Sequence, residues 1–424
     1  MTKMNDGPLE LVIVLATSTG GVGTHVRSLV ERLPGLGVQV TVAAPAETGE
    51  RFGFAEAGAR FVPVEIATAP RPQQDLAAVR ELRRVLGSAD VVHAHGFRAA
   101  ALTGLALGRR RRGRTPFVAT WHNAVLGGGP KRTLLAGLET LAARRADVTL
   151  GASSDLVERA RRLGAADARL APVAAPAMAA PQRDREAVRA ELGAGERPVV
   201  LAVGRLAPQK DYDTLLAAVA AWGRRDPQPL VVIAGDGPEQ ARLQTIVDDG
   251  GLDVRLLGRR DDVPDLLAAA DLYLITSTWE ARALVVQEAM RAGVPVVATE
   301  VGGLPELVGD AAVTVPPGDP RAVADAVVGL LDDPDRRAAL AAAGRTRSES
   351  WPDEDDTARH AADVYRELTA PRPADAAGAD GVAVIIPAKD EQDRVGVTVG
   401  AALGIAGVDV VVVVDDGSVD RTSG

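Results

Sequence analysis

The sequence predicts an α/β protein with two doubly wound domains and a short third unit. Apolar runs of strand length alternate with helical stretches through residues 11–151, and a second such series runs through residues 198–315. An Ala/Pro-rich segment, 171–181, separates the two series and is typical of a hinge. Because such alternation builds parallel sheets covered by helices on both faces, the two domains are expected to face a cleft at the carboxyl ends of their strands.

The first domain is predicted to span residues 1–172, and the second 173–370. In the first, strands are expected at Leu11–Ala16, Val38–Ala43, Asp90–His93, Phe117–Thr120 and Val148–Gly151, with helices such as Leu76–Leu86 and Thr133–Arg144. In the second, strands are expected at Pro198–Val203, Leu230–Ala234, Val254–Leu257, Leu272–Thr276, Val294–Thr299 and Ala312–Val315. The helices between them are expected at Tyr212–Ala221, Pro238–Val247, Val263–Ala269 and Leu284–Ala292. A last helix, over 353–368, is a candidate to cross back to the first domain.

After an Ala/Pro/Asp-rich linker, 371–380, a third unit is predicted over residues 381–424. Its expected elements are a strand at Val382–Ile386, a helix at Asp393–Leu403 and a strand at Val408–Val414, which together make a short βαβ fragment.

Composition excludes several classes of protein. The chain has no cysteine, so disulfides, thiolate zinc sites and cysteine nucleophiles are all excluded. No apolar run approaches the roughly 20 residues that span a bilayer, and the first residues lack the pattern of a signal peptide. We therefore expect a cytoplasmic protein.

Charge is distributed unevenly along the chain. Residues 1–180 carry 23 basic and 15 acidic side chains, whereas the remainder carries 25 and 42. The densest basic cluster is Arg109–Arg114. It has two interpretations: a solvated loop before the strand at Phe117, or a peripheral contact with an anionic membrane at its inner face.

Charged side chains follow two strands of the second domain. Arg205 and Lys210 lie on the loop after the first strand, at a spacing that can clamp a diphosphate from two sides. Glu280 follows a later strand and Glu288 lies in the next helix, where carboxylates can accept hydrogen bonds from sugar hydroxyls. The start of that helix also offers free N–H groups to phosphate oxygens.

Glycines and histidines follow strands of the first domain. The turn that contains Gly21 and Gly23 joins the first strand to its helix, and glycines permit close approach of the backbone to a ligand. His93, His95 and His122 lie at the ends of two later strands. We expect His93 to be structural and His95 to face the cleft.

The second domain contains a set of motifs at defined positions: Gly204-Arg205 with Lys210, Gly235–Pro238, Ser277–Glu280, Gln287–Thr299 and Val301–Val308. Through these motifs it resembles the donor-binding half of family 4 (group 1) retaining glycosyltransferases, which have two Rossmann-like domains in the GT-B arrangement. The resemblance implies that Arg205 and Lys210 bind the donor diphosphate, Glu288 the ribose and Glu280 the transferred sugar. It also places Gly237 among the residues that bind the donor. In the first, acceptor-side domain it implies that Gly21 and Gly23 contact the donor and that His122 contacts the sugar.

This resemblance implies transfer of a hexose-type sugar from a nucleotide-diphosphate donor to a glycan, lipid-linked or small-molecule acceptor. No Asp-x-Asp metal motif stands in a suitable place, so neither a metal nor a cofactor is expected. Two departures stand out: Ala281-Arg282 replaces the family's Gly-Phe, and Val173–Pro176 replaces its Asn-Gly-Val-Asp. The alternatives are a GT-B-fold epimerase or phosphorylase, and a non-catalytic protein that binds nucleotide sugars.

The third unit contains two further motifs, Ile385–Glu391 and Val414–Asp420. They resemble the first two nucleotide-contacting loops of family 2 glycosyltransferases of the GT-A fold, so the third unit resembles the opening of that family. The later metal-binding motif and catalytic base are missing, so we expect a truncated, catalytically incompetent fragment.

Overall fold

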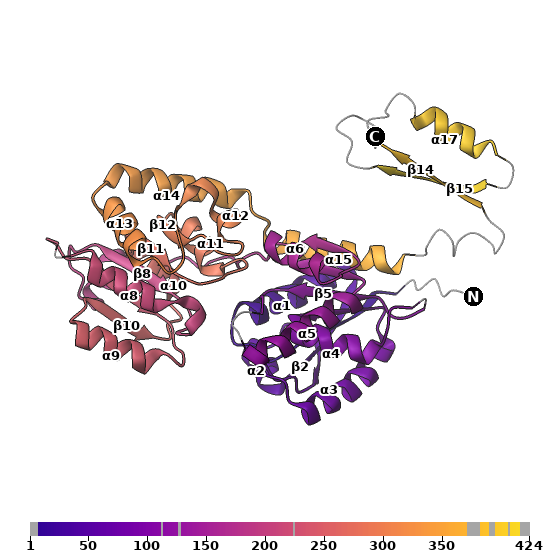
Figure 1. Cartoon of the computed structure of the whole chain (residues 1–424), viewed down its shortest axis with the longest axis horizontal. Coiled ribbons are helices and arrows are strands. Elements are labelled where there is room, and N and C mark those ends of the chain that lie inside the picture. The colour runs from indigo at the N-terminus through magenta and orange to yellow at the C-terminus, as the bar shows by residue number, and fades with distance from the viewer. Residues whose placement is uncertain are drawn as a thin grey trace. The chain divides into compact units, whose positions relative to one another are not determined.

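A computed structural model describes residues 7–111, 113–125, 129–223, 225–370, 382–389, 395–405 and 408–415. The chain divides into two units, Met1–Val364 and Tyr365–Gly424. The larger unit contains the two predicted α/β domains (Figure 1).

The first domain is built on a seven-stranded parallel sheet in the order β3-β2-β1-β4-β5-β6-β7. Its strands are β1 (Leu9–Leu15), β2 (Val38–Ala44), β3 (Arg60–Pro63), β4 (Val91–His95), β5 (Phe117–Trp121), β6 (Val148–Gly151) and β7 (Ala168–Leu170). Its helices are α1 (Gly21–Arg32), α2 (Ala46–Phe52), α3 (Pro72–Val85), α4 (Phe97–Leu107), α5 (Gly129–Arg145) and α6 (Ser154–Arg162). Every residue of β4 and β5 is buried, as expected for central strands covered on both faces.

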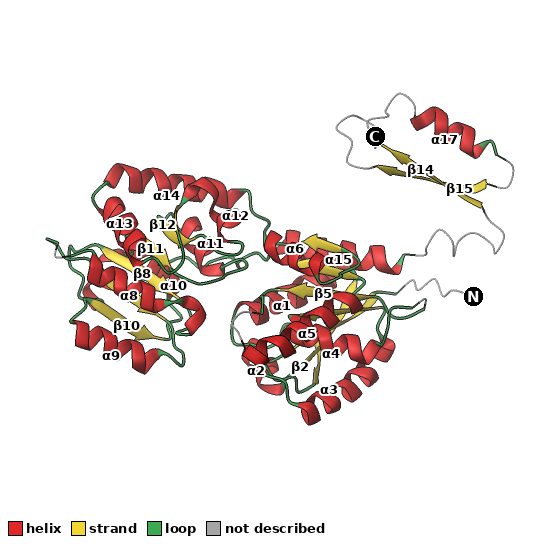
Figure 2. Ribbon diagram, in the orientation of Figure 1, coloured by secondary structure: helices red, strands yellow, loops and turns green. Residues whose placement is uncertain are grey.

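The second domain is built on a six-stranded parallel sheet in the order β10-β9-β8-β11-β12-β13. Figure 2 shows helices around the strands of this domain. Its strands are β8 (Val199–Val203), β9 (Leu230–Ala234), β10 (Val254–Gly258), β11 (Leu272–Ile275), β12 (Val296–Thr299) and β13 (Val313–Val315). Its helices are α7 (Arg185–Glu191), α8 (Tyr212–Ala221), α9 (Gln240–Gly250), α10 (Val263–Ala269), α11 (Leu284–Arg291), α12 (Leu304–Val308), α13 (Pro320–Leu331) and α14 (Pro334–Glu349).

The order of the strands reverses direction once in each sheet. In the first sheet β1 pairs with β2 on one side and with β4 on the other, so the reversal lies between β1 and β4. In the second sheet β8 pairs with β9 on one side and with β11 on the other, so the reversal lies between β8 and β11. The helices that follow such a pair lie on opposite faces of the sheet. Their diverging loops leave a crevice, which is where open α/β sheets bind ligands.

The helix expected over 353–368 is present as α15 (Glu354–Thr369). Its first turn is held to α1 of the first domain, since Arg32 contacts Glu354 at 3.1 Å and Asp355 at 2.8 Å. Glu354 also accepts a hydrogen bond from the backbone N–H of Ala177 in the hinge. The start of α15 thus contacts the first domain.

The smaller unit contains β14 (Val382–Ala388), α17 (Val395–Leu403) and β15 (Val408–Asp415). The two strands pair in parallel, which is the predicted βαβ arrangement. Ile385 and Val397 are 67% and 75% exposed, so much of the apolar surface of this unit is uncovered. The linker predicted over 371–380 lies outside the described residues.

Candidate functional site

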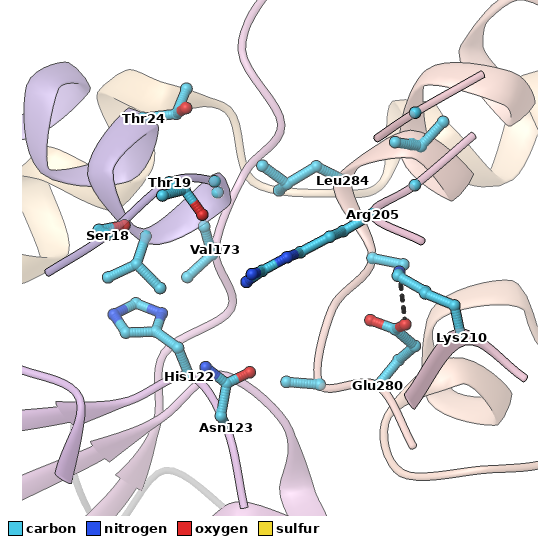
Figure 3. Close-up of a pocket in the computed structure, with 18 of the residues that line it drawn as sticks. Ser18, Thr19, Thr24, His122, Asn123, Val173, Arg205, Lys210, Glu280 and Leu284 are labelled. Atoms are coloured by element: carbon cyan, nitrogen blue, oxygen red, sulfur yellow. Dashed lines mark hydrogen bonds and ion pairs between the residues drawn. The ribbon is translucent and has the colours of Figure 1, made fainter. Parts of the chain in front are cut away.

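A cavity of about 1120 Å³ in the larger unit lies at the crevices of both sheets. Its lining comes from the loops after β1, β4 and β5 and from the loops after β8, β9, β10 and β11. Most of the residues singled out from sequence line it: Gly21, His95, His122, Arg205, Lys210, Gly237, Glu280 and Glu288. Figure 3 shows Arg205 extending into this cavity, with Lys210 and Glu280 beside it.

Arg205 and Lys210 are held by the loop that links β8 to α8. Lys210 ends a short 3-10 helix, and Asp211 then adopts a left-handed conformation with φ of 48°. The Asp211 carboxylate caps α8 by accepting hydrogen bonds from the Thr214 backbone N–H, at 3.3 Å, and from its hydroxyl, at 2.7 Å. Thr276, at the end of β11, donates to the carbonyl of Lys210 at 3.1 Å. These bonds hold the lysine beside the β11 loop.

Lys210 forms an ion pair with Glu280, with 2.6 Å between Nζ and Oε1. The same oxygen accepts a hydrogen bond from the Ser277 hydroxyl at 2.7 Å. The side chains of Lys210 and Glu280 are 22% and 11% exposed, so the pair is only partly in contact with water. Each charge therefore balances the other inside the cavity.

The β11 loop that carries Glu280 is supported from behind by two glycines. The backbone N–H of Gly303 donates to the carbonyl of Glu280 at 2.8 Å. A Cβ on Gly302 would lie 2.0 Å from that same carbonyl oxygen, and Gly302 has φ of +53°. The closeness of the two loops therefore requires glycine at position 302.

Glu288 lies one turn into α11 and lines the cavity. Burial raises the pKa of its carboxyl group to about 7, while nearby Arg291 acts in the opposite direction. The group is therefore poised between its neutral and ionised forms near neutral pH, and it can accept hydrogen bonds from ligand hydroxyls when ionised.

Gly237 brings the β9 loop against the loop after β8. A Cβ on Gly237 would lie 2.3 Å from the carbonyl oxygen of Leu206, and one on Gly235 would lie 1.9 Å from that of Gly204. Leu206 donates its N–H to the carbonyl of Asp236 at 2.7 Å. Both glycines thus permit the loop contact that shapes the wall beside Arg205.

The two glycines of the first βα turn have different surroundings. A Cβ on Gly21 would lie 3.0 Å from Leu284 Cδ1 at the start of α11, so this turn closely approaches the second domain. Gly23 does not line the cavity. A Cβ there would lie 2.2 Å from the ring of Phe52, so glycine at this position lets α1 pack closely against α2. The expected contact of Gly23 with the donor stays a prediction.

His122 and His95 line the cavity from the first domain and contact each other, with 3.0 Å between His95 Nδ1 and His122 Nε2. Burial lowers the pKa of both rings well below the usual value. His93 lies behind them, 1% exposed, and its Nε2 is 2.6 Å from the Thr120 hydroxyl. The expected division between a structural His93 and a cleft-facing His95 matches this arrangement.

The two departures from the family pattern are accommodated without loss of the cavity. The Arg282 guanidinium carbon lies 5.6 Å from the centre of the Trp351 ring, which is a cation–π contact. In the hinge, the Gln287 side chain donates to the carbonyl of Val173 at 3.2 Å and accepts from the N–H of Ala175 at 3.1 Å. The hinge is thus tied to α11.

The basic cluster predicted at Arg109–Arg114 is partly neutralised. Arg110 contacts Asp147 at 3.0 Å, and Arg114 contacts the same carboxylate. Asp147 also accepts from the N–H of Phe117 at 2.9 Å, which ties the cluster to the start of β5. Arg109 and Arg111 are exposed, and Arg112 lies outside the described residues. None of the helices among the described residues is long and apolar enough to cross a bilayer.

Three histidines form the one group of side chains, among the described residues, whose ligand atoms lie close enough together to hold a metal ion. They are His25, His95 and His122. Sequence reasoning singled out the last two at strand ends but missed His25, which lies inside α1.

Two family models match the chain. "Glycosyl transferase 4-like domain" matches residues 20–176, and "Glycosyl transferases group 1" matches residues 184–347. Neither match reaches residues 381–424, so the family 2 resemblance of the third unit stays a prediction. The matching loop residues Asp390, Glu391 and Asp416–Asp420 also lie outside the described residues.

Two curated relatives and one solved structure show the range of the similarity. The alpha-D-kanosaminyltransferase of Streptomyces kanamyceticus is 36% identical over 168 residues, which are 37% of this chain and 44% of that protein. The D-inositol 3-phosphate glycosyltransferase of Saccharomonospora viridis is 33% identical over 313 residues, 67% of this chain and 71% of that protein. The match to the first relative thus spans less than half of its length.

The solved structure is that of Anabaena HepE in complex with UDP-glucose. It superposes with a TM-score of 0.73 at 21% identity, over 85% of this chain and all of that one. This likeness shows the fold, which is the two-domain GT-B arrangement predicted from sequence. Because the inositol phosphate glycosyltransferase is similar over more than two thirds of its length, the chain belongs to the group 1 glycosyltransferase family.

Proposed function

We propose that the chain transfers a hexose-type sugar, with retention of configuration, from a nucleoside diphosphate sugar bound in the cavity between the two sheets. The observation that carries this proposal is the convergence of Arg205, Lys210, Glu280 and Glu288 at the reversal point of the second sheet. Two cations and two carboxylates at this spacing match a ligand with a diphosphate at its centre and hydroxyl groups at both ends.

Each group has a role in this proposal. Arg205 offers a planar fork of donors to the diphosphate, and Lys210 leaves its contact with Glu280 to bind the same phosphates. Glu280, released from the lysine, accepts hydrogen bonds from the transferred sugar. Glu288 in its ionised form accepts from the ribose hydroxyls.

The first domain completes the proposed site. The backbone at Gly21 and the side chain of His122 lie on the wall opposite the cations. His122 is neutral, because burial lowers the pKa of its ring, so it contacts a sugar as a polar group without charge. The charge that develops on the departing diphosphate is balanced by Arg205, Lys210 and the N-terminus of α11, and we propose that no metal takes part in transfer.

Relatives support this class of reaction by their names alone. One is a kanosaminyltransferase and another glycosylates an inositol phosphate, while the solved neighbour binds UDP-glucose. A small polyol or amino-sugar acceptor fits these names, and a lipid-linked or glycan acceptor is the alternative for a cytoplasmic enzyme. The exposed Arg109 and Arg111 are where a peripheral contact with an anionic membrane would form.

The test is to incubate the protein with UDP-glucose, GDP-mannose and dTDP-glucose and to follow release of the nucleoside diphosphate. The anomeric configuration of the product is then read by NMR. We expect release from at least one donor, a retained configuration, and the same rate in excess EDTA. An inverted product would refute the proposed stereochemistry, and a protein that binds donors but never releases sugar would favour a non-catalytic binding role.

The membrane contact has a separate test, sedimentation with vesicles that contain an anionic lipid. Binding at low salt that is lost at high salt, and that weakens in Arg109→Ala, supports it. Absence of binding, or binding that ignores salt, refutes it.

A further inference from the structure

Histidine is scarce in this chain and gathers in one place. The sequence contains five histidines and no cysteine. His25, His93, His95 and His122 are all buried and lie side by side. His360, on α15, lines a second cavity of about 250 Å³ together with His25 and His93. All five therefore surround one region of the first domain.

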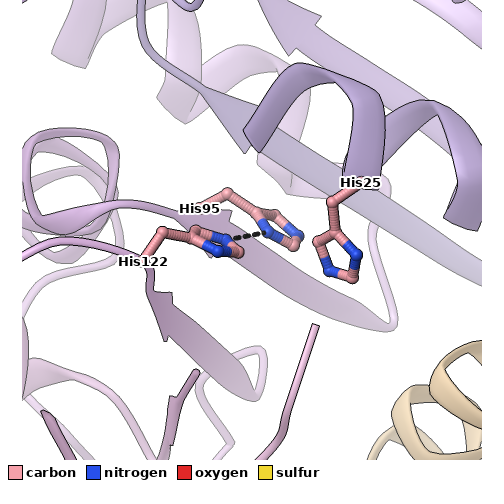
Figure 4. Close-up of side chains that lie close together, drawn as sticks. All are labelled: His25, His95 and His122. Atoms are coloured by element: carbon pink, nitrogen blue, oxygen red, sulfur yellow. Dashed lines mark hydrogen bonds between the residues drawn. The ribbon is translucent and has the colours of Figure 1, made fainter. Parts of the chain in front are cut away.

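Three of these rings are arranged around a common point (Figure 4). The ring centres of His25, His95 and His122 are 5.4, 5.5 and 5.3 Å apart. Each ring has one nitrogen that lies within 4.8 Å of a nitrogen on the other two. A tetrahedral Zn²⁺ site with Zn–N bonds of about 2.0–2.1 Å places its ligand nitrogens roughly 3.3 Å apart. Small rotations of the rings would therefore bring the three nitrogens to the spacing of a tetrahedral zinc site.

One ring nitrogen in this group lacks a partner. His95 Nδ1 contacts His122 Nε2, but His95 Nε2 is buried without a hydrogen-bond partner. A buried polar atom without a hydrogen-bond partner destabilises the folded chain. The ring of His93 also lies beside His95, with 4.1 Å between the ring centres and 37° between the ring planes. The hydrogen-bonding capacity of the histidine cluster is thus not fully used by protein groups.

The three rings are held by stiff elements. His25 lies on α1, His95 is the last residue of β4, and His122 follows β5 directly. β4 pairs with both β1, which leads into α1, and β5, so the sheet order brings the three positions together. Ligands on helices and strands are positioned more accurately than ligands on loops, which favours a preformed site.

We propose that His25, His95 and His122 form a three-histidine site for Zn²⁺, with its fourth coordination position open toward the donor cavity. Zinc is favoured because the site offers nitrogen ligands alone, and Mg²⁺ and Ca²⁺ require oxygen. His95 and His122 line the donor cavity, which places the open position there.

Metal binding has a consequence for transfer, and this part rests on the proposed function. Zn²⁺ takes up the ring nitrogen of His122 and leaves that side chain unable to contact the sugar. A bound ion therefore inhibits transfer and is not the metal of the reaction. The metal site itself stands on the geometry of the rings and holds whether or not the chain transfers sugar.

The test is calorimetric titration of the full chain, prepared without a histidine tag, with ZnCl₂. Titration with Co²⁺ gives a second readout, the visible absorption of a tetrahedral cobalt site. Because the chain has no cysteine, thiolate binding cannot interfere. We expect about one ion per chain and a gain in thermal stability with zinc.

The variants are His25→Gln and His95→Gln, with His360→Gln as the matched control. Each of the first two is expected to weaken binding by at least about a hundredfold, since loss of even an outer partner of a metal ligand costs ~10–100-fold. His360→Gln retains wild-type affinity. Circular dichroism confirms that each variant is folded, and His25→Gln alone decides the question if His95→Gln does not fold. No binding by the wild type, or binding that survives His25→Gln, overturns the site.

Inhibition is tested with the same proteins. We expect Zn²⁺ to slow donor turnover by the wild type and by His360→Gln, but not by His25→Gln, because His25 does not line the donor cavity. Equal inhibition of His25→Gln overturns the link between this site and transfer. A chain that binds zinc but turns over no donor refutes the proposed transferase and leaves the zinc site intact.

Discussion

Lys210 and Glu280, separated by 70 positions in sequence, meet with 2.6 Å between Nζ and Oε1. The pair joins the loop after β8 to the loop after β11, the two strands at which the second sheet reverses direction. In the proposed function, a donor diphosphate replaces Glu280 as the partner of Lys210, and the ion pair holds both side chains in the cavity until the donor binds.

Removal of Lys210 is expected to lower stability, because Glu280 is left partly buried with only Ser277 as its partner. We expect Lys210→Met to cost about 1 kcal/mol or more in the free energy of unfolding, measured by urea titration. The double variant Lys210→Met/Glu280→Gln recovers most of this loss. The matched control is Arg242, whose pair with Asp213 is about half exposed, and Arg242→Met should cost at most about 1 kcal/mol. An equal loss in both single variants would show that the Lys210 pair is an ordinary surface contact.

Glu288 is expected to make nucleotide binding depend on pH. Its pKa is raised to about 7, so the proton must leave before the carboxylate can accept two ribose hydroxyls. Affinity for UDP is expected to rise as pH increases from about 6 to about 8, with uptake of the released proton by the buffer. Calorimetry in buffers of different ionisation enthalpy measures both quantities.

The same raised pKa affects stability in the opposite direction. The folded chain holds the Glu288 proton more tightly than the unfolded chain, so this group contributes less stability as pH rises from its normal pKa toward 7. Glu288→Gln should remove both pH effects. If the variant shows the same pH dependence of UDP affinity, a different group controls it.

Gly302 is expected to be essential for the position of Glu280. Gly302→Ala introduces a Cβ that would lie 2.0 Å from the Glu280 carbonyl oxygen in a left-handed conformation, and should cost about 2 kcal/mol or more in stability and weaken donor binding. Gly329, in α13, has open space around its Cβ position, so Gly329→Ala should be neutral or stabilising. Thermal unfolding compares the two, and equal melting temperatures would contradict the account of the loop.

Arg282 is expected to destabilise the folded chain. Its Nε and Nη2 atoms are buried without hydrogen-bond partners, and burial lowers the pKa of the guanidinium to about 10. Arg282→Met keeps the length of the side chain and removes the unpaired charge, so the melting temperature should stay the same or rise. A large fall would mean that the contact with Trp351 outweighs the burial of charge.

Strong periodicity allowed much of the fold to be predicted from sequence. The bounds of β6, β9, α8 and α10 agree with expectation residue for residue, because each is a buried apolar segment with a clear start and end. The short strands β3 and β7 were not predicted. They have four and three residues and lie at the edges of the first sheet, so little of their sequence is buried and periodic.

Site residues could be predicted from sequence where the chemistry of the side chain itself indicates a role. They could not be predicted where the role depends on which residues pack together in the fold. Arg205, Lys210, Glu280 and Glu288 converge on one cavity as their strand-end positions suggested. The packing of Gly23 against Phe52 could not be predicted, because a glycine-rich turn does not indicate which side chain lies beside it. The position of His25 beside the other histidines could not be predicted from sequence either, since it depends on β1 lying beside β4 in the sheet.

The most direct test of the central claim is the equilibrium affinity for UDP-glucose, GDP-mannose and dTDP-glucose, measured by calorimetry for the wild type and Arg205→Ala. Arg336→Ala, which removes an exposed arginine from α14 of the same domain, is the matched control. We predict that at least one donor binds the wild type and Arg336→Ala equally, and binds Arg205→Ala at least about tenfold more weakly, as expected for loss of a charge-assisted contact. Equal affinity in Arg205→Ala, or no binding of any donor by the wild type, would contradict the proposed donor site.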